Sequence, residues 1–212
     1  LNGSTISAFI AIVFLYFLRY IVFRSNPIMA LLAAVIFTIH PIHTEVVANV
    51  KSRDEIMSLL FICLTFIYAF RYLESKNTKM LIWGMVCYFL AFLSKEYAIS
   101  LMLLLPLSFV FFGKKTIGES IVATIPYIGV TILYVIIRLS IVNDVVEGAS
   151  SEILNNPYAL ASPTEKLATE ISTCLNYLKL LLFPHPLSAD YSYNTIPYVD
   201  FSNIMVWVSL AI

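Results

Sequence analysis

Charged residues are scarce in this chain of 212 residues. Asp, Glu, Lys and Arg together make up 12% of it, about half the share found in a typical soluble domain. Hydrophobic residues make up 60%, more than the core of a soluble protein of this size can bury. This composition excludes a soluble domain and favours helices that cross a lipid bilayer, because a helix satisfies its own backbone hydrogen bonds.

An excess of charge of one sign is also missing. The chain has 13 basic and 13 acidic residues, so no basic field indicates binding to nucleic acid. Its three cysteines, Cys63, Cys87 and Cys174, lie singly in apolar stretches and form no CxxC pair. We interpret them as small packing residues, without a disulfide or a zinc site.

Long apolar runs organise the first two-thirds of the chain. They lie at about 5–23, 28–40, 56–70, 80–93, 97–112 and 120–142. Several are shorter than the roughly 20 residues of a full membrane span, and polar flanks are expected to extend them. We therefore predict an all-α, polytopic transmembrane helix bundle of GT-C-like type, with six transmembrane helices in residues 1–142.

The remainder of the chain is more polar. Residues 143–203 are predicted to form an extracytoplasmic loop that contains an amphipathic helix at about 164–183, since polar residues recur there every three to four positions. This helix could lie on the membrane surface, or span it with its polar stripe facing the bundle. Residues 204–212 are predicted to start a further transmembrane helix. Because the chain begins without Met and stops inside an apolar run, we expect a fragment truncated at both ends.

The connections between the runs alternate in charge. Every second connection carries mostly unpaired cations: Arg24, Arg71, Lys76, Lys79, Lys114 and Lys115. By the positive-inside rule these connections lie in the cytoplasm. The opposite helix ends carry mixed acids, bases and histidines, which are costly next to a membrane and are usually functional. The sequence therefore predicts a functional site on the extracytoplasmic face.

Two histidines and a glutamate surround Pro41 at one of these ends. Proline suits the first turn of a helix, so His40 can cap a short helix that starts at Pro41. His40, His43 and Glu45 could bind a divalent metal ion, move a proton or hydrogen-bond a sugar. Their spacing, HxxHxE, is not a known zinc pattern, and a capped helix end in headgroup water is the simpler alternative. The metal stays open.

A second charged group, Arg53, Asp54 and Glu55, leads into the third run. Acids in the first turn of a helix are favourable on their own account, because they face the positive end of the helix dipole. Alternatively, Arg53 binds an anionic headgroup that Asp54 or Glu55 orients.

Lys95 and Glu96 lie between two apolar runs with almost no loop around them. Adjacent residues on a helix point apart, so we expect each to find a partner on another helix. Arg138 and Arg53 are the candidates for Glu96. A pocket of Lys95, Arg138 and Arg53 would suit a phosphate, whereas simple snorkelling to the membrane surface is the alternative.

The last motif, at 187–194, places Asp190 beside Tyr191 in an aromatic loop. Tyrosines next to a carboxylate can hold a sugar by stacking and hydrogen bonds. They are also common in the aromatic belts at membrane surfaces, so this motif alone is weak.

The order of these motifs resembles the membrane half of the protein O-mannosyltransferases that carry transmembrane helices followed by tetratricopeptide repeats, including their bacterial relatives. The most specific pieces are His-Pro-Ile-His-Thr-Glu at 40–45 and Leu-Ser-Ala-Asp-Tyr-Ser at 187–192. The series is completed by Leu1-Asn2, Ser52-Arg53-Asp54-Glu55, Ser94-Lys95-Glu96, Arg138 and Phe183-Pro184. The similarity thus covers nearly the whole chain.

The resemblance implies a GT-C-type glycosyltransferase. Such enzymes move a sugar, here mannose or a similar hexose, from a polyprenyl-phosphate donor to a Ser or Thr hydroxyl of a protein or to another acceptor. The active face would be periplasmic in a bacterial inner membrane, or lumenal in the endoplasmic reticulum. The family's catalytic acid lies upstream of where this chain begins, so we expect the general base and the acceptor-holding repeats to lie outside it.

The chemistry of such a donor, an apolar tail and a phosphate leaving group that needs cations, suggests roles for the motif residues. The donor phosphate would be bound by Lys95, Arg138 and Arg53. The site for sugar or acceptor would be shaped by His40, His43, Glu45, Asp54, Glu55, Glu96, Asp190 and Tyr191. Some GT-C enzymes use a divalent ion and others do not, so a metal cofactor at His40, His43 and Glu45 is neither required nor excluded.

Two other classes of membrane protein compete with a transferase. A secondary transporter would explain charges within the membrane, but it places them near the midplane, where its helices break. A scaffold without chemistry would leave the gathering of histidines and mixed charges on one face unexplained.

Overall fold

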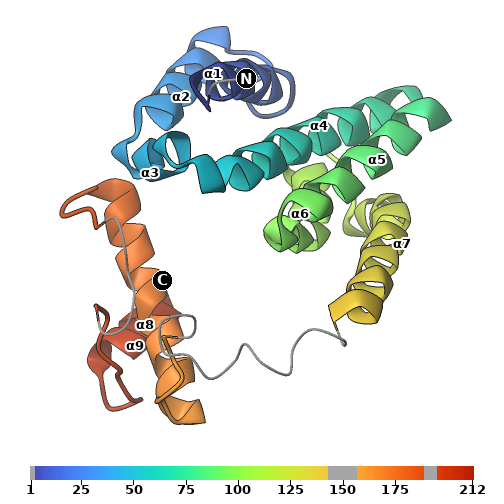
Figure 1. The fold of residues 1–212 in the computed structure, drawn as a ribbon. Coiled ribbons are helices and arrows are strands. Elements are labelled where there is room, and N and C mark those ends of the chain that lie inside the picture. Colours follow the sequence, from blue (N-terminus) through green and yellow to red (C-terminus); the bar gives the residue numbers. More distant parts are fainter. Residues whose placement is uncertain (1–2, 143–156, 189–194) are drawn as a thin grey trace. The chain divides into compact units, whose positions relative to one another are not determined.

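A computed structural model describes residues 3–142, 157–188 and 195–212 (Figure 1). Every regular element in these ranges is a helix, as the sequence predicted. The contacts divide the chain into two units, Leu1–Leu139 and Ser140–Ile212, which are described separately.

Unit 1 contains seven α-helices joined by short turns of other helix types. The α-helices are α1 (Gly3–Phe17), α2 (Pro27–Ile39), α3 (Thr44–Ala48), α4 (Arg53–Ser75), α5 (Thr78–Ser94), α6 (Leu101–Phe111) and α7 (Ile117–Val142). The shorter turns are the π-helical η1 (Leu18–Val22) and the 3₁₀ turns η2 (Pro41–His43), η3 (Val50–Ser52) and η4 (Glu96–Ser100).

The described helices correspond to the six apolar runs. Arg53–Ser75 and Ile117–Ile141 are each long and apolar enough to cross a membrane, and the bent pair Pro27–Ile39 and Pro41–Ala48 adds a third span if it crosses as one. The other runs form shorter apolar helices at Ser7–Val22, Thr78–Ser94 and Glu96–Phe111. The chain is thus an integral membrane helix bundle, and the six separate crossings remain a prediction.

The break after α2 follows from its sequence. Pro41 has no backbone N–H to continue the helix, so α2 ends at Ile39 and His40 adopts an extended conformation. The Nδ1 atom of His40 then accepts a hydrogen bond from the backbone N–H of Ile42, 3.3 Å away, and caps η2. The predicted capping by His40 is confirmed. The axis turns by 50° across this break.

The core of unit 1 lies where α4 and α5 pack as a hairpin against α6, α7 and η1. Large aromatic side chains fill it, among them Phe70, Tyr88, Phe92, Phe109 and Tyr127. The Tyr88 and Thr131 hydroxyls lie 3.0 Å apart and link α5 to α7 by a hydrogen bond. Pairing these groups is favourable inside an apolar bundle, because an unpaired polar group there is costly.

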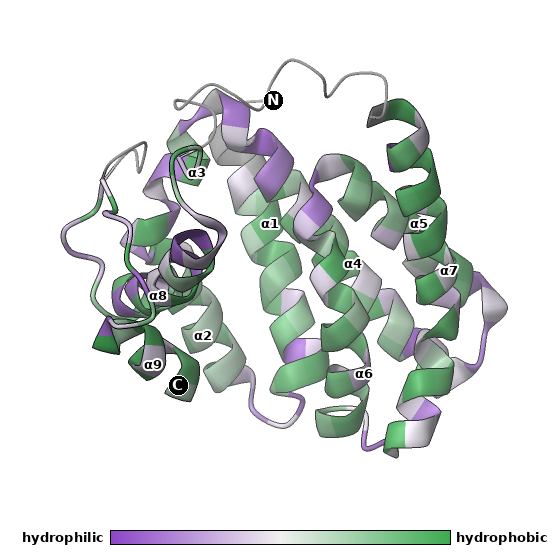
Figure 2. Ribbon diagram, turned by 90° about the horizontal axis from the view of Figure 1, so that it is seen from below, coloured by the Kyte–Doolittle hydropathy of each residue, from purple (hydrophilic) through white to green (hydrophobic). Residues whose placement is uncertain are grey.

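Large apolar side chains also cover the outside of unit 1. Ile36, Leu103, Val122 and Ile132 are each more than half exposed. Figure 2 shows hydrophobic residues along the bodies of α1, α4, α5 and α7, and hydrophilic ones mainly at ends and turns. Such a surface is expected to face lipid, since exposed apolar patches of this extent are rare on soluble monomers.

Unit 2 contains α8 (Pro163–Leu182) and α9 (Ile204–Ala211). The α8 helix lies over the range in which the sequence predicted an amphipathic one. Ser162 and Glu165 form a capping box at its start, with Pro163 in the first turn. The buried Thr169 receives a 3.0 Å hydrogen bond from the backbone N–H of Val199, which ties the following segment to α8. Whether α8 lies on the membrane or spans it remains a prediction.

Candidate functional site

An ion-pair cluster joins the start of α4 to the end of α5. The chain leaves α5 at Lys95, which has an extended backbone. The Lys95 ammonium group lies 2.9 Å from the Asp54 carboxylate and 3.4 Å from that of Glu55. The hydrogen bond with Asp54 is the main cause that raises the pKa of Lys95 above its usual range, so Lys95 is a cation at any physiological pH.

A second ion pair joins η4 to the far end of α7. The Arg138 guanidinium contacts the Glu96 carboxylate and donates a 3.0 Å hydrogen bond to the hydroxyl of Tyr134, one turn earlier on α7. The expectation that Lys95 and Glu96 take partners from different helices is therefore confirmed. Arg138, and not Arg53, is the partner of Glu96.

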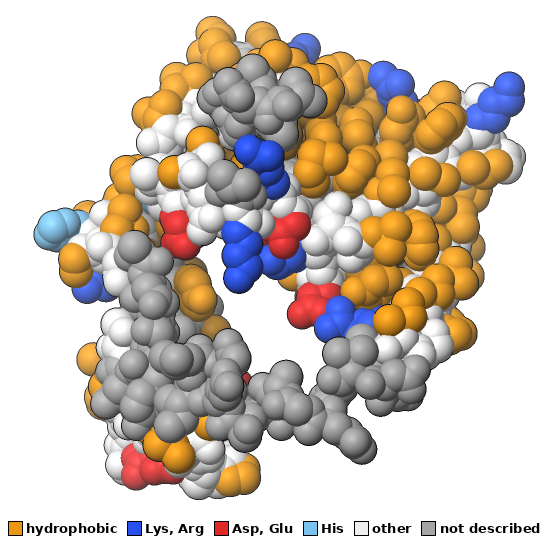
Figure 3. Space-filling view, in the orientation of Figure 1, with side chains coloured by type: hydrophobic (Ala, Val, Ile, Leu, Met, Phe, Trp, Pro, Cys, Tyr) orange, Lys and Arg blue, Asp and Glu red, His pale blue; other side chains and the backbone are white. Residues whose placement is uncertain are grey.

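These pairs form one cluster, because Lys95 and Glu96 are adjacent in the chain. It contains three carboxylates, from Asp54, Glu55 and Glu96, and two cations, from Lys95 and Arg138. Figure 3 shows acidic and basic side chains next to one another on this face of unit 1. The five side chains are 35% to 61% exposed, so water screens the pairs and each contributes little to stability. Their exposure makes them accessible to a ligand.

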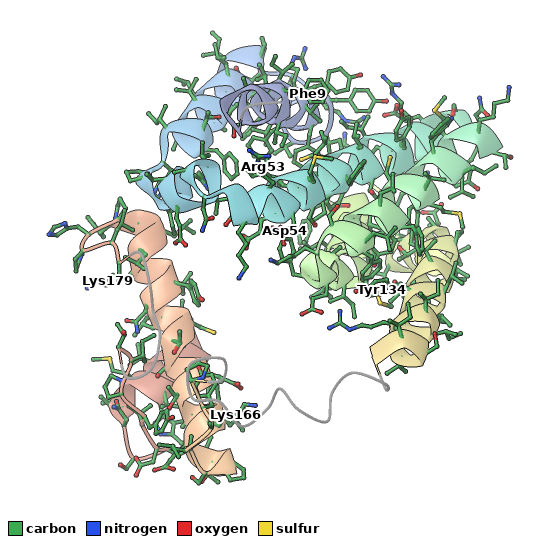
Figure 4. The ribbon with its side chains drawn as sticks, in the orientation of Figure 1. Phe9, Arg53, Asp54, Tyr134, Lys166 and Lys179 are labelled. Carbon is green, nitrogen blue, oxygen red and sulfur yellow. The ribbon has the colours of Figure 1, made fainter. Side chains whose placement is uncertain are left out.

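Arg53 is placed differently from the other predicted site residues on α4. Its side chain is exposed, and Figure 4 shows it on a different side of the start of α4 from Asp54. Lys95 and Arg138 thus each pair with a carboxylate, whereas Arg53 forms no ion pair among the described residues.

An apolar cavity of about 230 Å³ lies beside the cluster, enclosed by α1, α2, α3, α4 and η4. Glu55 lines both the cavity and the ion-pair cluster. The Tyr97 side chain also lines the cavity, and its hydroxyl donates a 3.1 Å hydrogen bond to the backbone carbonyl of Glu55. Most of the remaining wall is apolar: Ile10, Phe37, Val46, Val47, Ile56 and Leu59.

The two histidines serve different elements. His40 caps η2, whereas the His43 ring packs on Phe37 with 4.4 Å between ring centroids and reaches the cavity wall. Glu45 is exposed on α3. Among the described residues, no three His, Cys, Asp or Glu side chains are placed to hold a metal ion. His40, His43 and Glu45 therefore do not form a metal site in this arrangement, and we do not propose one. The predicted site residues Asp190 and Tyr191 lie outside the described residues.

Two tyrosines of this site, Tyr97 and Tyr134, were not predicted from the sequence. Tyr134 precedes Arg138 by four residues, which places both on one face of α7. That i, i+4 spacing is readable from the sequence alone. Tyr97 follows Glu96 directly, but its bond to the backbone of Glu55 depends on how η4 packs against α4.

The family model described as dolichyl-phosphate-mannose-protein mannosyltransferase matches residues 1–141 of this chain. The chain belongs to this family. The O-mannosyltransferase resemblance seen in the motifs is thereby confirmed, and the matched residues of the mannosyltransferase family contain the whole ion-pair cluster and the apolar cavity.

Curated members of the family give a similar picture. The chain is 25% identical over 230 residues to protein O-mannosyl-transferase TMTC3 of Mus musculus, covering 94% of this chain and 24% of the relative. It is 26% identical over 222 residues to TMTC3 of Homo sapiens, covering 91% and 24%. A match to human TMTC4 has 36% identity over 83 residues, covering 36% and 11%. The chain thus spans about a quarter of the length of the TMTC3 relatives. No solved structure gives a significant match.

Proposed function

We propose that this mannosyltransferase-family chain forms the donor-binding part of a membrane enzyme that moves mannose from a polyprenyl-phosphate carrier to a Ser or Thr hydroxyl of a protein. The observation that carries the proposal is the ion-pair cluster of Lys95 and Arg138 within the region that matches the family. The reaction takes place on the extracytoplasmic side of the membrane, which is the periplasmic side in a bacterium or the lumenal side in the endoplasmic reticulum.

The chemistry of such a donor suits this site. Its phosphate is the leaving group, and negative charge develops on it as the bond to the sugar breaks. Cations held at that position stabilise the transition state more than the ground state. Lys95 is held by Asp54 and Glu55, and Arg138 is held by Glu96, so both cations have fixed positions before the donor arrives.

Because carboxylates already pair with Lys95 and Arg138, the donor phosphate binds by replacing a carboxylate, which is an exchange of one anion for another. In the free protein each cation already has a carboxylate partner, which lowers the attraction for a phosphate. A bound phosphate must therefore replace at least one of these partners. Because the pairs are exposed and individually weak, this exchange costs little. The released carboxylates then face the sugar, whose hydroxyls can donate hydrogen bonds to them.

The apolar cavity supports the same assignment. A polyprenyl carrier needs a hydrophobic surface next to the phosphate site, and the cavity wall adjoins the cluster at Glu55. A transporter is less compatible, because the charged residues gather at helix ends and not at a midplane break. The acceptor side of the proposal rests on the names of the relatives, which are protein O-mannosyl-transferases.

Transfer of mannose to an acceptor peptide by the full-length protein in liposomes tests the proposal. Lys95→Ala and Arg138→Ala should each lower turnover on the order of a hundredfold, the typical loss when one transition-state contact is removed. Arg138→Lys should restore little if both guanidinium nitrogens contact the phosphate, because lysine is a point charge.

The matched control is Lys114→Ala, which removes an exposed cation from the α6–α7 turn. It should transfer mannose normally. Near-normal transfer by both Lys95→Ala and Arg138→Ala, at unchanged thermal stability, would show that these residues anchor the helix ends and do not bind the donor.

A further inference from the structure

A second group of charges lies at the opposite end of α4 from the candidate site. The α4 helix is 23 residues long, so Arg71 and Glu74 lie about 26 and 30 Å along it from Asp54, close to the thickness of a bilayer core. Here the end of α4 meets the end of α1 and η1. Arg24 pairs with Glu74 at 2.8 Å, and the Tyr20 hydroxyl also contacts Glu74.

Two arginines at this end lack a carboxylate partner within the part of the chain that the structure describes. Arg71 donates a 2.7 Å hydrogen bond to the Tyr16 hydroxyl, and its guanidinium lies 5.9 Å from the centre of the Tyr16 ring. Arg19 uses only its Nη1 atom, which donates to the backbone carbonyls of Phe23 and Arg24. Its Nε and Nη2 atoms have no partner among the described residues. With Glu74 engaged by Arg24, the local charge is positive.

An open apolar groove of about 450 Å³ ends at Arg19. It runs between α1 and α2 and is lined by Ile12, Leu15, Tyr16, Arg19, Pro27 and Leu31. The exposed wall residues Ile12 and Leu31 would be covered by a hydrocarbon chain. The groove thus combines an apolar wall with the guanidinium of Arg19. Arg71 does not line the groove, but it bonds to the lining residue Tyr16 and adds a second positive charge near it.

The position of Arg19 depends on an irregularity of the backbone. The helix widens from α-helical to π-helical at Leu18–Val22, and the backbone N–H of Phe23 bonds back to the carbonyl of Leu18 at 2.8 Å. Such π-helical turns occur frequently at functional sites. The carbonyls of Phe23 and Arg24, which follow this turn, accept hydrogen bonds from Nη1 of Arg19. These bonds fix the orientation of the guanidinium, whose Nε and Nη2 atoms have no partner among the described residues.

We propose that this groove binds one anionic glycerophospholipid, with an acyl chain along α1 and α2 and its phosphate at Arg19. A planar guanidinium suits a phosphate, because it offers paired donors. Two uncompensated cations favour a lipid of net negative charge over a zwitterionic one, whose own cation they repel. By the positive-inside prediction, the lipid belongs to the cytoplasmic leaflet, where anionic lipids attract basic segments. The proposal is independent of the proposed transfer reaction.

Native mass spectrometry of the full-length protein tests the proposal, after delipidation in detergent and addition of phosphatidylglycerol or phosphatidylcholine. We expect one phosphatidylglycerol to bind at least about tenfold more tightly than phosphatidylcholine. Arg19→Gln should weaken phosphatidylglycerol binding about tenfold, as expected for loss of a charge-assisted contact. Leu31→Trp should weaken it as well, because the larger side chain fills the groove from an exposed position and leaves the core unchanged.

Controls separate a specific site from general attraction. Lys114→Gln removes one positive charge from the same end of the bundle, outside the groove, and should bind phosphatidylglycerol as the unmodified protein does. An equal loss in Lys114→Gln and Arg19→Gln would overturn the proposal, as would wild-type binding by Leu31→Trp. Glycerol 3-phosphate, which has the headgroup chemistry without acyl chains, should bind far more weakly. Equal binding of this compound would also overturn the lipid assignment.

Discussion

The contact between α5 and α7 at Gly84 allows a sharp test of the packing. A Cβ atom added to Gly84 would lie 2.5 Å from the Tyr127 hydroxyl oxygen, well inside van der Waals contact, and the Tyr127 Cζ and Tyr68 Cβ atoms follow at 3.4 and 3.5 Å. Tyr127 is only 1% exposed, so its ring has no free space to move into. Gly84→Ala therefore forces α5 and α7 apart.

The expected magnitude follows from two opposing effects. Overpacking of a filled core typically costs about 1–3 kcal/mol. Replacing glycine by alanine inside a helix stabilises the helix by up to about 1 kcal/mol. We expect a net loss on the order of 1–2 kcal/mol, which corresponds to a drop of a few degrees in Tm for a bundle of this size.

A second substitution should reverse the effect. The Tyr127 hydroxyl is buried and has no hydrogen-bond partner among the described residues. Tyr127→Phe removes the oxygen that clashes and leaves Cζ at 3.4 Å, an ordinary contact. It also removes a buried unsatisfied polar group, so the single variant should be as stable as the unmodified protein or more stable. The double variant should recover most of the loss, with a coupling of at least about 1 kcal/mol.

Thermal unfolding of the full-length protein in detergent, followed with a thiol-reactive dye, measures these changes in a Cys174→Ser background. Cys174 is exposed in the folded chain, whereas Cys63 and Cys87 are buried until the bundle opens. Gly129→Ala is the matched control, because an added Cβ there has no atom within 4 Å. Equal Tm values for Gly84→Ala and Gly129→Ala, or no recovery in the double variant, would refute the close approach of α5 and α7.

Two further predictions concern the charged site and α8. Asp54→Asn should lower KM for the polyprenyl-phosphate donor, because the carboxylate at 2.9 Å no longer competes for Lys95; an unchanged or higher KM would contradict the exchange of anions. Ser162→Ala should raise amide hydrogen exchange in the first turn of α8 about fivefold, as expected for loss of a cap. Hydrogen bonds with Ser162 lower the pKa of Glu165 in the folded protein. The stability that the ionised Glu165 adds to the cap is therefore fully present above the usual pKa of a glutamate. It is lost as the pH falls through the lower pKa of Glu165 in the folded protein. Protection that does not change over that pH range would contradict this role.

Much of the fold could be predicted from the sequence because a bilayer leaves few choices. An apolar run in lipid must satisfy its backbone internally, which requires a helix. The end of the helix before Pro41 and the capping of the next turn by His40 were also predictable. A proline lacks the backbone N–H that would continue a helix, and this effect is confined to the residues next to it. The resemblance to O-mannosyltransferases likewise followed from the order of short motifs.

The pairing of the charges could not be predicted in full. The sequence required partners for Lys95 and Glu96 on other helices, but Arg53 and Arg138 were equal candidates for Glu96. The choice depends on how α4 and α7 are rotated about their axes, and that rotation is determined by packing of apolar side chains far from the charges. Arg53 lies on another side of the start of α4 from Asp54 simply because consecutive residues of a helix point apart (Figure 4).

The sequence by itself determined that this chain is an all-α membrane bundle of the mannosyltransferase family, because composition, periodicity and motif order are local properties. Only the tertiary structure decided which cation meets which carboxylate, that an apolar cavity adjoins them, and that Arg19 lines an open apolar groove. These features arise from contacts between residues distant in sequence, such as Gly84 with Tyr127 and Lys95 with Asp54. Side-chain packing sets such contacts, and it leaves no local signal in the chain.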